Sequence, residues 1–194
     1  QINIVIESPQ NDSIELWYLE WDINYFIAWF LRSYLIFSID KFFLPKLEQE
    51  SLAEINNRYT EHIMTLYDFD DPIDDRDYNQ DESDKIELMS QSLLQLSEYF
   101  GDERSISVAF TGTVTPHIII GMNNGIGEIS LVDKEKNVKW KYNFDMQQFI
   151  KATLFEIRNA LIEWKANYYN PDIKDEYEQL LNNVNKHISS NGFE

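Results

Sequence analysis

The chain has 194 residues, of which 43% are hydrophobic and 14% aromatic, enough apolar material for the core of one globular domain. Its 34 acidic residues outnumber its 16 basic residues, and the net charge of −18 disfavours nucleic acids and anionic membranes as partners, because binding to either depends on Lys and Arg. The absence of cysteine excludes disulfides, thiolate nucleophiles and Cys-based zinc sites. This charge favours a basic protein as the partner.

The N-terminal part of the chain predicts a strand followed by a helix. Residues 2–7 alternate weakly and end at Ser8-Pro9, which is typical of a strand closed by a turn, whereas residues 14–21 are ambiguous. From Asp22, a suitable N-cap, apolar residues recur at helical spacing until Pro45 stops the pattern. No basic region followed by an apolar stretch is seen at the N-terminus, so we expect a cytoplasmic protein without a secretory signal.

The most apolar segment, residues 21–44, raises the question of a membrane span. Four charged residues interrupt it: Asp22, Arg32, Asp40 and Lys41. Its uncharged runs are shorter than the roughly 20 residues that a spanning helix requires, so we expect a buried core helix and no membrane contact. Three aromatic residues in front of this helix are candidates for an exposed partner surface: Trp17, Tyr18 and Trp21.

Two amphipathic helices are predicted next. The first covers residues 47–67, with Glu54 placed four residues before Arg58 as an i, i+4 ion pair. The second carries its apolar stripe from Ile86 to Phe100, and Gly101 is suited to end it in the left-handed conformation.

Turn chemistry and β-branched residues dominate the following part of the chain. Four strands are predicted, over residues 105–111, 117–122, 127–132 and 138–144. Asn124-Gly125 is a strong hairpin signal, so the strands should form a small antiparallel meander. Gly121, Gly125 and Gly127 are interpreted as hairpin glycines, because no nucleotide-binding order of strand, glycine turn and helix is present.

Two further helices close the chain. Asp145 with Gln148 three residues later is the pattern of a capped helix start, and Asn170-Pro171 breaks this long helix. A terminal helix follows from Ile173, with a frayed tail after Ser189. The prediction is therefore one α+β domain over residues 1–194, in which a small antiparallel meander packs against about five helices.

The acidic segment at residues 68–84 is the strongest local anomaly. It holds nine acids against the single base Arg76, a net charge of −8, and is expected to form a loop between two helices. One reading is a solvated loop, and another is a docking surface for a basic partner with Phe69 or Tyr78 as an aromatic anchor. The predicted partner-binding residues are Asp70, Asp71, Asp74, Asp75, Asp77, Tyr78, Asp81, Glu82 and Asp84.

No pattern in the sequence indicates a catalytic, metal or cofactor site. The closest EF-hand register begins at Asp75 but has Gln80 in place of the turn glycine and Ile86 in place of the bidentate glutamate. His62, His117 and His187 have no partner at zinc-ligand spacing. The pairs Asp133 with Glu135 and Glu163 with Lys165 lie in a predicted turn and a predicted helix, not on the adjacent strands that a metal nuclease uses. We expect no enzyme activity and no cofactor.

The chain resembles bacterial immunity proteins, the small inhibitors that protect a cell from contact-dependent or polymorphic toxins. The resemblance rests on size, acidity, the lack of cysteine, the helical segment Trp21 to Leu31 and the strand-then-helix passage Val138 to Phe149. It implies a cytoplasmic inhibitor that binds a basic, nuclease-type toxin and has no catalytic activity. Two other hypotheses stay open: a nucleic-acid mimic that inhibits a defence nuclease, and a small ligand-binding domain or enzyme with a pocket between the sheet and the aromatic helix.

Overall fold

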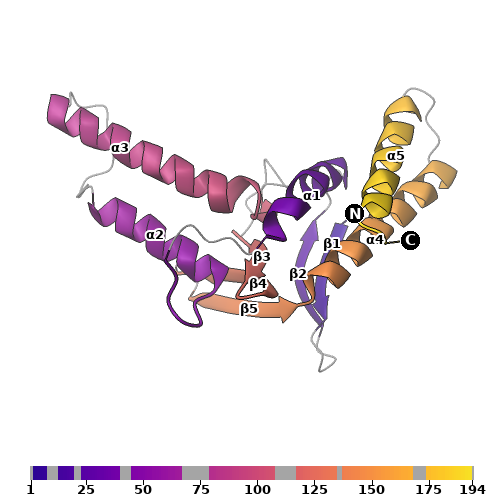
Figure 1. Cartoon of the computed structure of the whole chain (residues 1–194), viewed down its shortest axis with the longest axis horizontal. Helices are drawn as coiled ribbons and strands as arrows, with labels where there is room; N and C mark the ends of the chain where they lie inside the picture. The colour runs from indigo at the N-terminus through magenta and orange to yellow at the C-terminus, as the bar shows by residue number, and fades with distance from the viewer. Residues whose placement is uncertain are drawn as a thin grey trace.

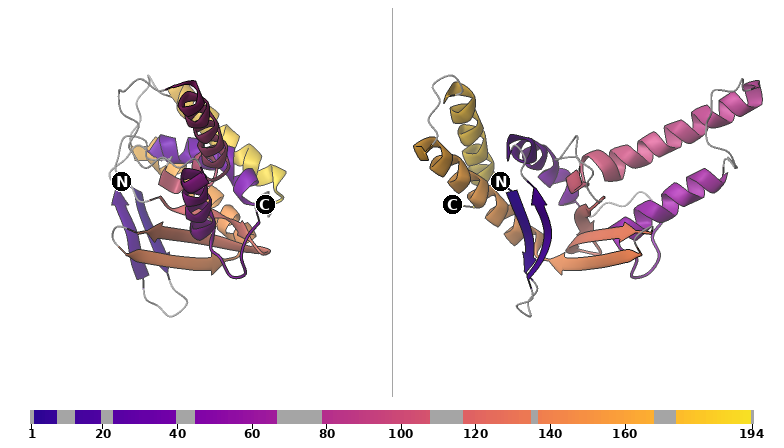
Figure 2. Two further views of the ribbon diagram at one scale, coloured as in Figure 1. Left: turned by 90° about the vertical axis from the view of Figure 1, so that its left-hand side faces the viewer. Right: turned by 180° about the vertical axis from the view of Figure 1, so that it is seen from behind.

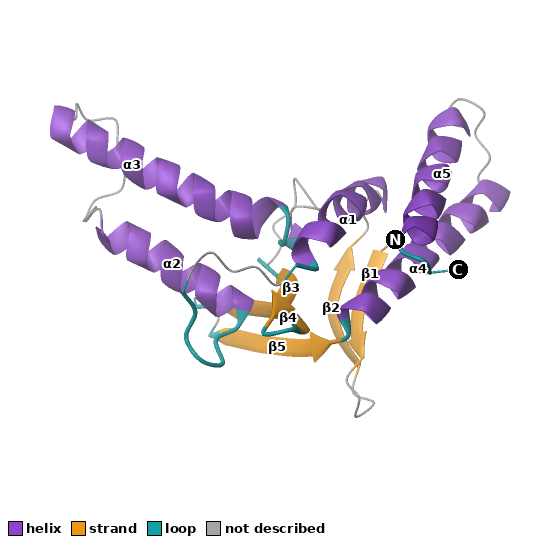
Figure 3. Cartoon of the chain, viewed as in Figure 1, coloured by secondary structure: helices purple, strands orange, loops and turns teal. Residues whose placement is uncertain are grey.

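The computed structural model describes residues 2–7, 13–19, 23–39, 45–66, 79–107, 117–134, 137–167 and 174–193. The elements in these ranges are β1 (Ile2–Glu7), β2 (Ser13–Leu19), α1 (Ile23–Phe37), α2 (Leu52–Leu66), α3 (Gln80–Ser97), the π-helical turn η1 (Glu98–Asp102), β3 (Ile119–Asn123), β4 (Ile126–Asp133), β5 (Val138–Phe144), α4 (Met146–Asn167) and α5 (Lys174–Ser190). The described residues form five α-helices and an antiparallel meander, arranged as Figures 1 and 3 show, which confirms the predicted α+β class.

The three-stranded sheet has the order β3-β4-β5, and both of its pairs are antiparallel. The β3–β4 turn is Asn124-Gly125, and both residues adopt positive φ, 55° and 77°. This left-handed conformation is the one that the twist of a two-residue hairpin requires, and Asn and Gly tolerate it best. The predicted hairpin is confirmed.

A second, two-stranded sheet pairs β1 with β2 in antiparallel register, from Ile2 opposite Leu19 to Glu7 opposite Ser13. The ambiguous segment after residue 13 is therefore a strand. This hairpin is a sheet of its own, drawn in indigo in Figure 2. Trp17 and Tyr18 lie on β2, but their side chains fall outside the described part of the structure, as does Trp21.

The two faces of the three-stranded sheet carry separate hydrophobic clusters because successive strand residues point to opposite sides. Ile118 and Ile120 belong to the larger cluster, which also contains residues of α1, α4 and α5. Ile119, between them, packs with Leu52 and Phe100 in the smaller cluster formed by α2 and the end of α3. Helix α2 thus packs on one face of the sheet, whereas α1 and α4 contact it from the larger cluster.

Helix α1 buries the face predicted from its spacing, and Ile27, Phe30 and Phe37 are fully enclosed. Its aromatic rings stack in series, with Phe30 at 5.7 Å from Tyr34 between ring centroids. Among the described residues, no helix has both the length and the apolarity needed to cross a membrane.

Helix α2 starts at Leu52 instead of residue 47, because Ser51 and Glu54 form its capping box. The Ser51 backbone N–H donates to the Glu54 carboxylate at 3.0 Å, and the Glu54 N–H donates to Ser51 Oγ at 3.2 Å. Arg58 does not pair with Glu54 as predicted; its Nε and Nη2 donate to Glu50, at 2.6 and 2.8 Å. Glu54 instead pairs with Lys139 of β5. Tertiary proximity outweighs the weak i, i+4 preference.

Helix α3 begins within the segment predicted as an acidic loop, so residues 80–84 are helical and that prediction is wrong at its end. Asn79 is the N-cap, and it exchanges backbone-to-side-chain hydrogen bonds with Glu82 in a complete capping box. Gly101 does not end the helix with a positive φ either, since the chain continues through η1. Residues 67–78 lie outside the described ranges.

Two smaller expectations also change. The strand predicted over residues 105–111 is not formed at its start: Ser105 makes an isolated bridge to Ile119, and residues 106–107 form a short 3₁₀ turn. Residues 108–111 lie outside the described ranges. The tail after Ser189 is held in place, because the Asn191 amide donates to the Tyr34 hydroxyl at 2.8 Å and Phe193 packs on the larger cluster.

Candidate functional site

The predicted partner-binding residues that the structure describes lie on the first turn of α3. Asp81 and Asp84 are exposed, whereas Glu82 is half-buried and occupied in the capping box. The other six predicted residues fall outside the described ranges: Asp70, Asp71, Asp74, Asp75, Asp77 and Tyr78. The structure therefore brings three of the nine predicted residues together and leaves the others untested.

This turn lies at the far end of the arm that α2 and α3 form, away from both sheets (Figures 1 and 2). Residues 61–103 carry 14 acids and two bases, so this stretch holds −12 of the total charge of −18. The parts of this stretch that the structure describes, residues 61–66 and 79–103, hold eight acids and one base.

The acids at the start of α3 differ from the acids on α2 in their ion pairs. Lysines of the meander compensate the acids on α2: Lys134 pairs with Glu61, and Lys139 pairs with Glu54. Within the described ranges, no ion pair involves Asp81, Glu82 or Asp84. The start of α3 keeps its negative charge available to a partner.

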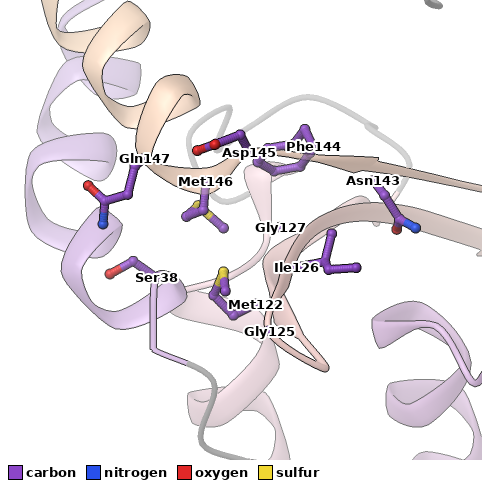
Figure 4. A pocket seen from close by; sticks show the side chains of 10 residues that line it. All are labelled: Ser38, Met122, Gly125, Ile126, Gly127, Asn143, Phe144, Asp145, Met146 and Gln147. Atoms are coloured by element: carbon purple, nitrogen blue, oxygen red, sulfur yellow. The ribbon is translucent and has the colours of Figure 1, made fainter.

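A cleft is found elsewhere, where the end of the sheet meets the start of α4 (Figure 4). We call it the α4 cleft; its volume is about 510 Å³, and it lies between Ser38 after α1, the β3–β4 hairpin and the β5–α4 junction. Met122 and Met146 face one another across it, with Ile126 on one side and Ser38 on the other. Gly127 lies in the wall of the cleft. A Cβ at this position would lie 2.8 Å from the Phe144 ring, so only glycine leaves room for that ring.

The polar groups of the α4 cleft can bind a ligand but do not form a catalytic arrangement. Of the lining residues that the structure describes, Asp145 alone is ionisable. Its Oδ1 accepts a hydrogen bond from the Gln148 N–H at 2.9 Å, which confirms the predicted cap of α4. A nucleophile would need a base within hydrogen-bond reach, and the lining provides none. Of the lining residues, sequence reasoning identified Asp145, Gly125 and Gly127, but only as cap and turn residues.

A second, smaller cleft of about 330 Å³ lies between α2 and the end of α3. Its lining includes Asn56, Thr60, Ser97 and His117, so it is mainly polar. His117 is exposed at this position and has no acidic partner among the lining residues. This cleft offers hydrogen-bonding groups without charge.

A carboxylate that sequence reasoning missed, Glu128, is almost completely buried under the start of α2. Its Oε1 accepts from the Leu52 N–H at 2.6 Å, and its Oε2 accepts from the Asn123 amide at 2.8 Å. A negative group at a helix N-terminus satisfies free N–H groups and interacts favourably with the helix dipole. Glu128 thus anchors α2 to the sheet, and its burial excludes a role in binding. In the sequence, only its position within the apolar strand predicted over residues 127–132 points to this role.

Arg104 is a buried cation, with 4% of its surface exposed. It donates to the Ile36 carbonyl at 3.2 Å and to the Tyr99 carbonyl at 3.3 Å, and it stacks on the Tyr99 ring. Burial lowers the pKa of this guanidinium from its usual value, against the opposing effects of Tyr99 and Glu103. Arg104 therefore closes the C-terminal ends of two helices instead of facing a ligand.

Two histidines and Lys165 remain among the residues that the sequence singled out, and each is described by its contacts or its exposure. His62 is exposed on α2, and His187 is half-buried with its Nδ1 at 2.9 Å from the Tyr34 hydroxyl. Lys165 pairs with Glu178 at 3.3 Å, not with Glu163. In the part of the chain that the structure describes, no group of three or more acidic or histidine side chains is arranged to hold a metal ion.

No known protein family, curated protein or solved structure matches this chain.

Proposed function

We propose that the chain is an acidic protein-binding inhibitor, an immunity protein that neutralises a basic, nuclease-type toxin by direct binding. The observation that carries the proposal is the excess of acid between residues 61 and 103, whose described parts, 61–66 and 79–103, hold eight acids and one base. Residues 61–103 hold 14 of the 34 acids and two of the 16 bases. The described acids at the start of α3 are free of ion pairs within the described ranges.

The chemistry of the expected partner explains why such a surface inhibits it. A nuclease holds the phosphate backbone with Lys and Arg side chains, whose charge supplies most of its affinity for nucleic acid. An acidic arm competes for those side chains, and its field accelerates the encounter with a basic protein. Inhibition by this route requires only a stable complex and no catalytic residue.

The test is neutralisation of the product of the neighbouring gene. We expect cells that express that product alone to stop growing, and cells that also express this chain to grow normally. With purified proteins, we expect one equivalent of this chain to abolish the nuclease activity and to elute with the toxin as one complex. Growth arrest despite soluble co-expression, or a nuclease that stays active beside a molar excess of the chain, would contradict the proposal.

A further inference from the structure

The α4 cleft has a chemical character that the acidic arm does not share. Its apolar surface comes from Met122, Ile126, Phe144 and Met146, and Ile126 leaves half of its surface exposed beside the hairpin turn. Methionine side chains are flexible and polarisable, so they adapt to a guest of irregular shape. Covering Ile126 removes apolar surface from water, which favours occupation of the cleft.

The opening of the cleft is lined by hydrogen-bond acceptors and one negative charge. Ser38, Asn143 and Gln147 offer oxygen atoms, and Asp145 is an exposed carboxylate at the side of α4. Ser38 Oγ donates its proton to the Leu35 carbonyl at 2.8 Å, so this hydroxyl is left to accept. The lining residues that the structure describes include no Lys, Arg or His. The polar side of the cleft thus complements a cationic donor.

An arginine side chain combines the two properties that the cleft requires. Its aliphatic stem packs on apolar surface while its guanidinium stays at the polar edge, and its five N–H donors satisfy several acceptors at once. Lysine offers fewer donors in a less planar arrangement, and a purely apolar side chain brings no positive charge to Asp145. The cleft volume of about 510 Å³ also admits the backbone next to the side chain.

We infer that the α4 cleft is a second contact surface, which receives an arginine side chain of the basic protein partner. The inference rests on the proposed function, because that function supplies a partner rich in Arg. Arginine is among the residues that contribute most binding energy at interface centres, where surrounding contacts exclude water. The cleft would then act as an anchor point, whereas the acidic arm accelerates association.

The experiment titrates the isotope-labelled protein with three capped tripeptides, Gly-Xaa-Gly, in which Xaa is arginine, citrulline or norleucine. Citrulline keeps the shape of arginine without its charge, and norleucine keeps only an apolar stem. We expect the arginine peptide to shift the amide resonances of Gly125 to Gly127 and of Phe144 to Gln147. Citrulline and norleucine should bind about tenfold more weakly, the factor that corresponds to one charge-assisted hydrogen bond.

The variant Asp145→Asn removes the charge and keeps the helix cap, because Asn is as good an N-cap as Asp. It should weaken binding of the arginine peptide by about tenfold. Asp175→Asn, the same change in the first turn of α5, is the matched control and should leave the shifts unchanged. Equal binding of citrulline or norleucine, or arginine-dependent shifts confined to Asp81–Asp84, would overturn the inference. A protein that neutralises the toxin but shows no cleft shifts overturns this inference alone and leaves the proposed function intact.

Discussion

At the scale of single residues, Arg104 shows how a buried charge can serve the fold. Its guanidinium donates to carbonyls near the ends of α1 and α3, which are 68 and five residues away in the chain. Carbonyl groups at a helix C-terminus lack intrahelical donors, and a cation there also complements the helix dipole. One side chain therefore holds together two helices whose ends would otherwise need water.

We predict that Arg104→Met destabilises the protein by about 2 to 4 kcal/mol, because the buried carbonyls lose their donors. Arg158→Met is the matched control, since Arg158 also stacks on an aromatic ring, at 4.5 Å from the Phe155 centroid, but makes no comparable bridge between helix ends within the described residues. The measurement is the free energy of unfolding in urea. Equal losses for the two variants would show that stacking, and not the carbonyl contacts, makes Arg104 important.

His187 is the residue whose protonation should be visible in the stability of α5. The Tyr34 hydroxyl accepts from the Asn191 amide at 2.8 Å, so its own proton is available to donate to the neutral Nδ1 of His187, at 2.9 Å. Burial lowers the pKa of His187 below 6.5, and the nearby charge of Lys186 lowers it further. The folded protein therefore favours the neutral ring.

A histidine with a lowered pKa in the folded state stabilises the protein above its unfolded pKa, and that contribution is lost as the pH falls through the folded pKa. We predict a loss of about 0.5 to 1 kcal/mol between pH 7 and pH 5, with the partial exposure of the ring taken into account. His187→Asn keeps an acceptor near Tyr34 without a titrating ring. Urea unfolding at several pH values should give a flatter profile for this variant; identical profiles would contradict the assignment.

At the scale of elements, α2 is attached to the meander through its first turns. Glu128 and Ser130 accept from the backbone of Leu52 and Ala53, at 2.6 and 3.1 Å. Burial raises the pKa of the Glu54 carboxyl, but hydrogen bonds from Lys139 and Ser51 outweigh this effect and lower it from 4.5 to about 2. The hydrogen bond from Arg58 likewise lowers the pKa of Glu50. Both carboxylates therefore stabilise the docked helix in their charged form.

Folding lowers both pKa values, so the stability from these two groups is present above the unfolded pKa of about 4.5 and is lost as the pH falls through each folded pKa, which is about 2 for Glu54. We predict that Glu54→Gln costs about 1 kcal/mol at pH 7 and that the difference from the unmodified protein narrows below pH 4.5. Glu61→Gln removes a more exposed pair with Lys134 and should change stability by less than about 0.5 kcal/mol. A constant difference across this pH range would refute the role of Glu54.

At the scale of the whole molecule, charge and shape act together. Helices α2 and α3 form one arm of the structure, and α4 with α5 forms the other side (Figure 1). The described residues 61–66 and 79–103 carry eight acids and one base, a net charge of −7, and this charge strengthens the negative field around the arm. Encounter with a basic protein should therefore start at this arm.

We predict that the association rate constant with the toxin falls by roughly tenfold or more as salt is raised from low to high concentration, because screening shortens the range of the field. The double variant Asp81→Asn with Asp84→Asn should slow association, while Asp175→Asn with Glu176→Gln, in the first turn of α5, should not. Stopped-flow fluorescence measures both rates. Equal slowing by the two double variants would indicate that only total charge matters and not the arm.

Features that depend on neighbours in sequence were predictable. The Asn124-Gly125 turn, the Asp145 cap and the inner stripe of α1 follow from residues within a few positions of one another. The early start of α3 was predictable too, because Asn79 followed by Glu82 is the capping-box pattern. The incorrect ion pair of Glu54 with Arg58 was also a local inference, but a local preference worth a few tenths of a kcal/mol does not withstand competing tertiary contacts.

The sequence by itself determined the α+β class, the order of most elements and the excess of acid between residues 61 and 103. Only the tertiary structure decided which charges are paired, which are buried and where a cleft opens. Glu128 meets Leu52 across 76 residues, and the α4 cleft joins Ser38 to the β3–β4 hairpin and the start of α4. The physical reason is range: backbone conformation responds to residues within about one helical turn, whereas burial and ion pairing depend on which distant segments the packed core brings together.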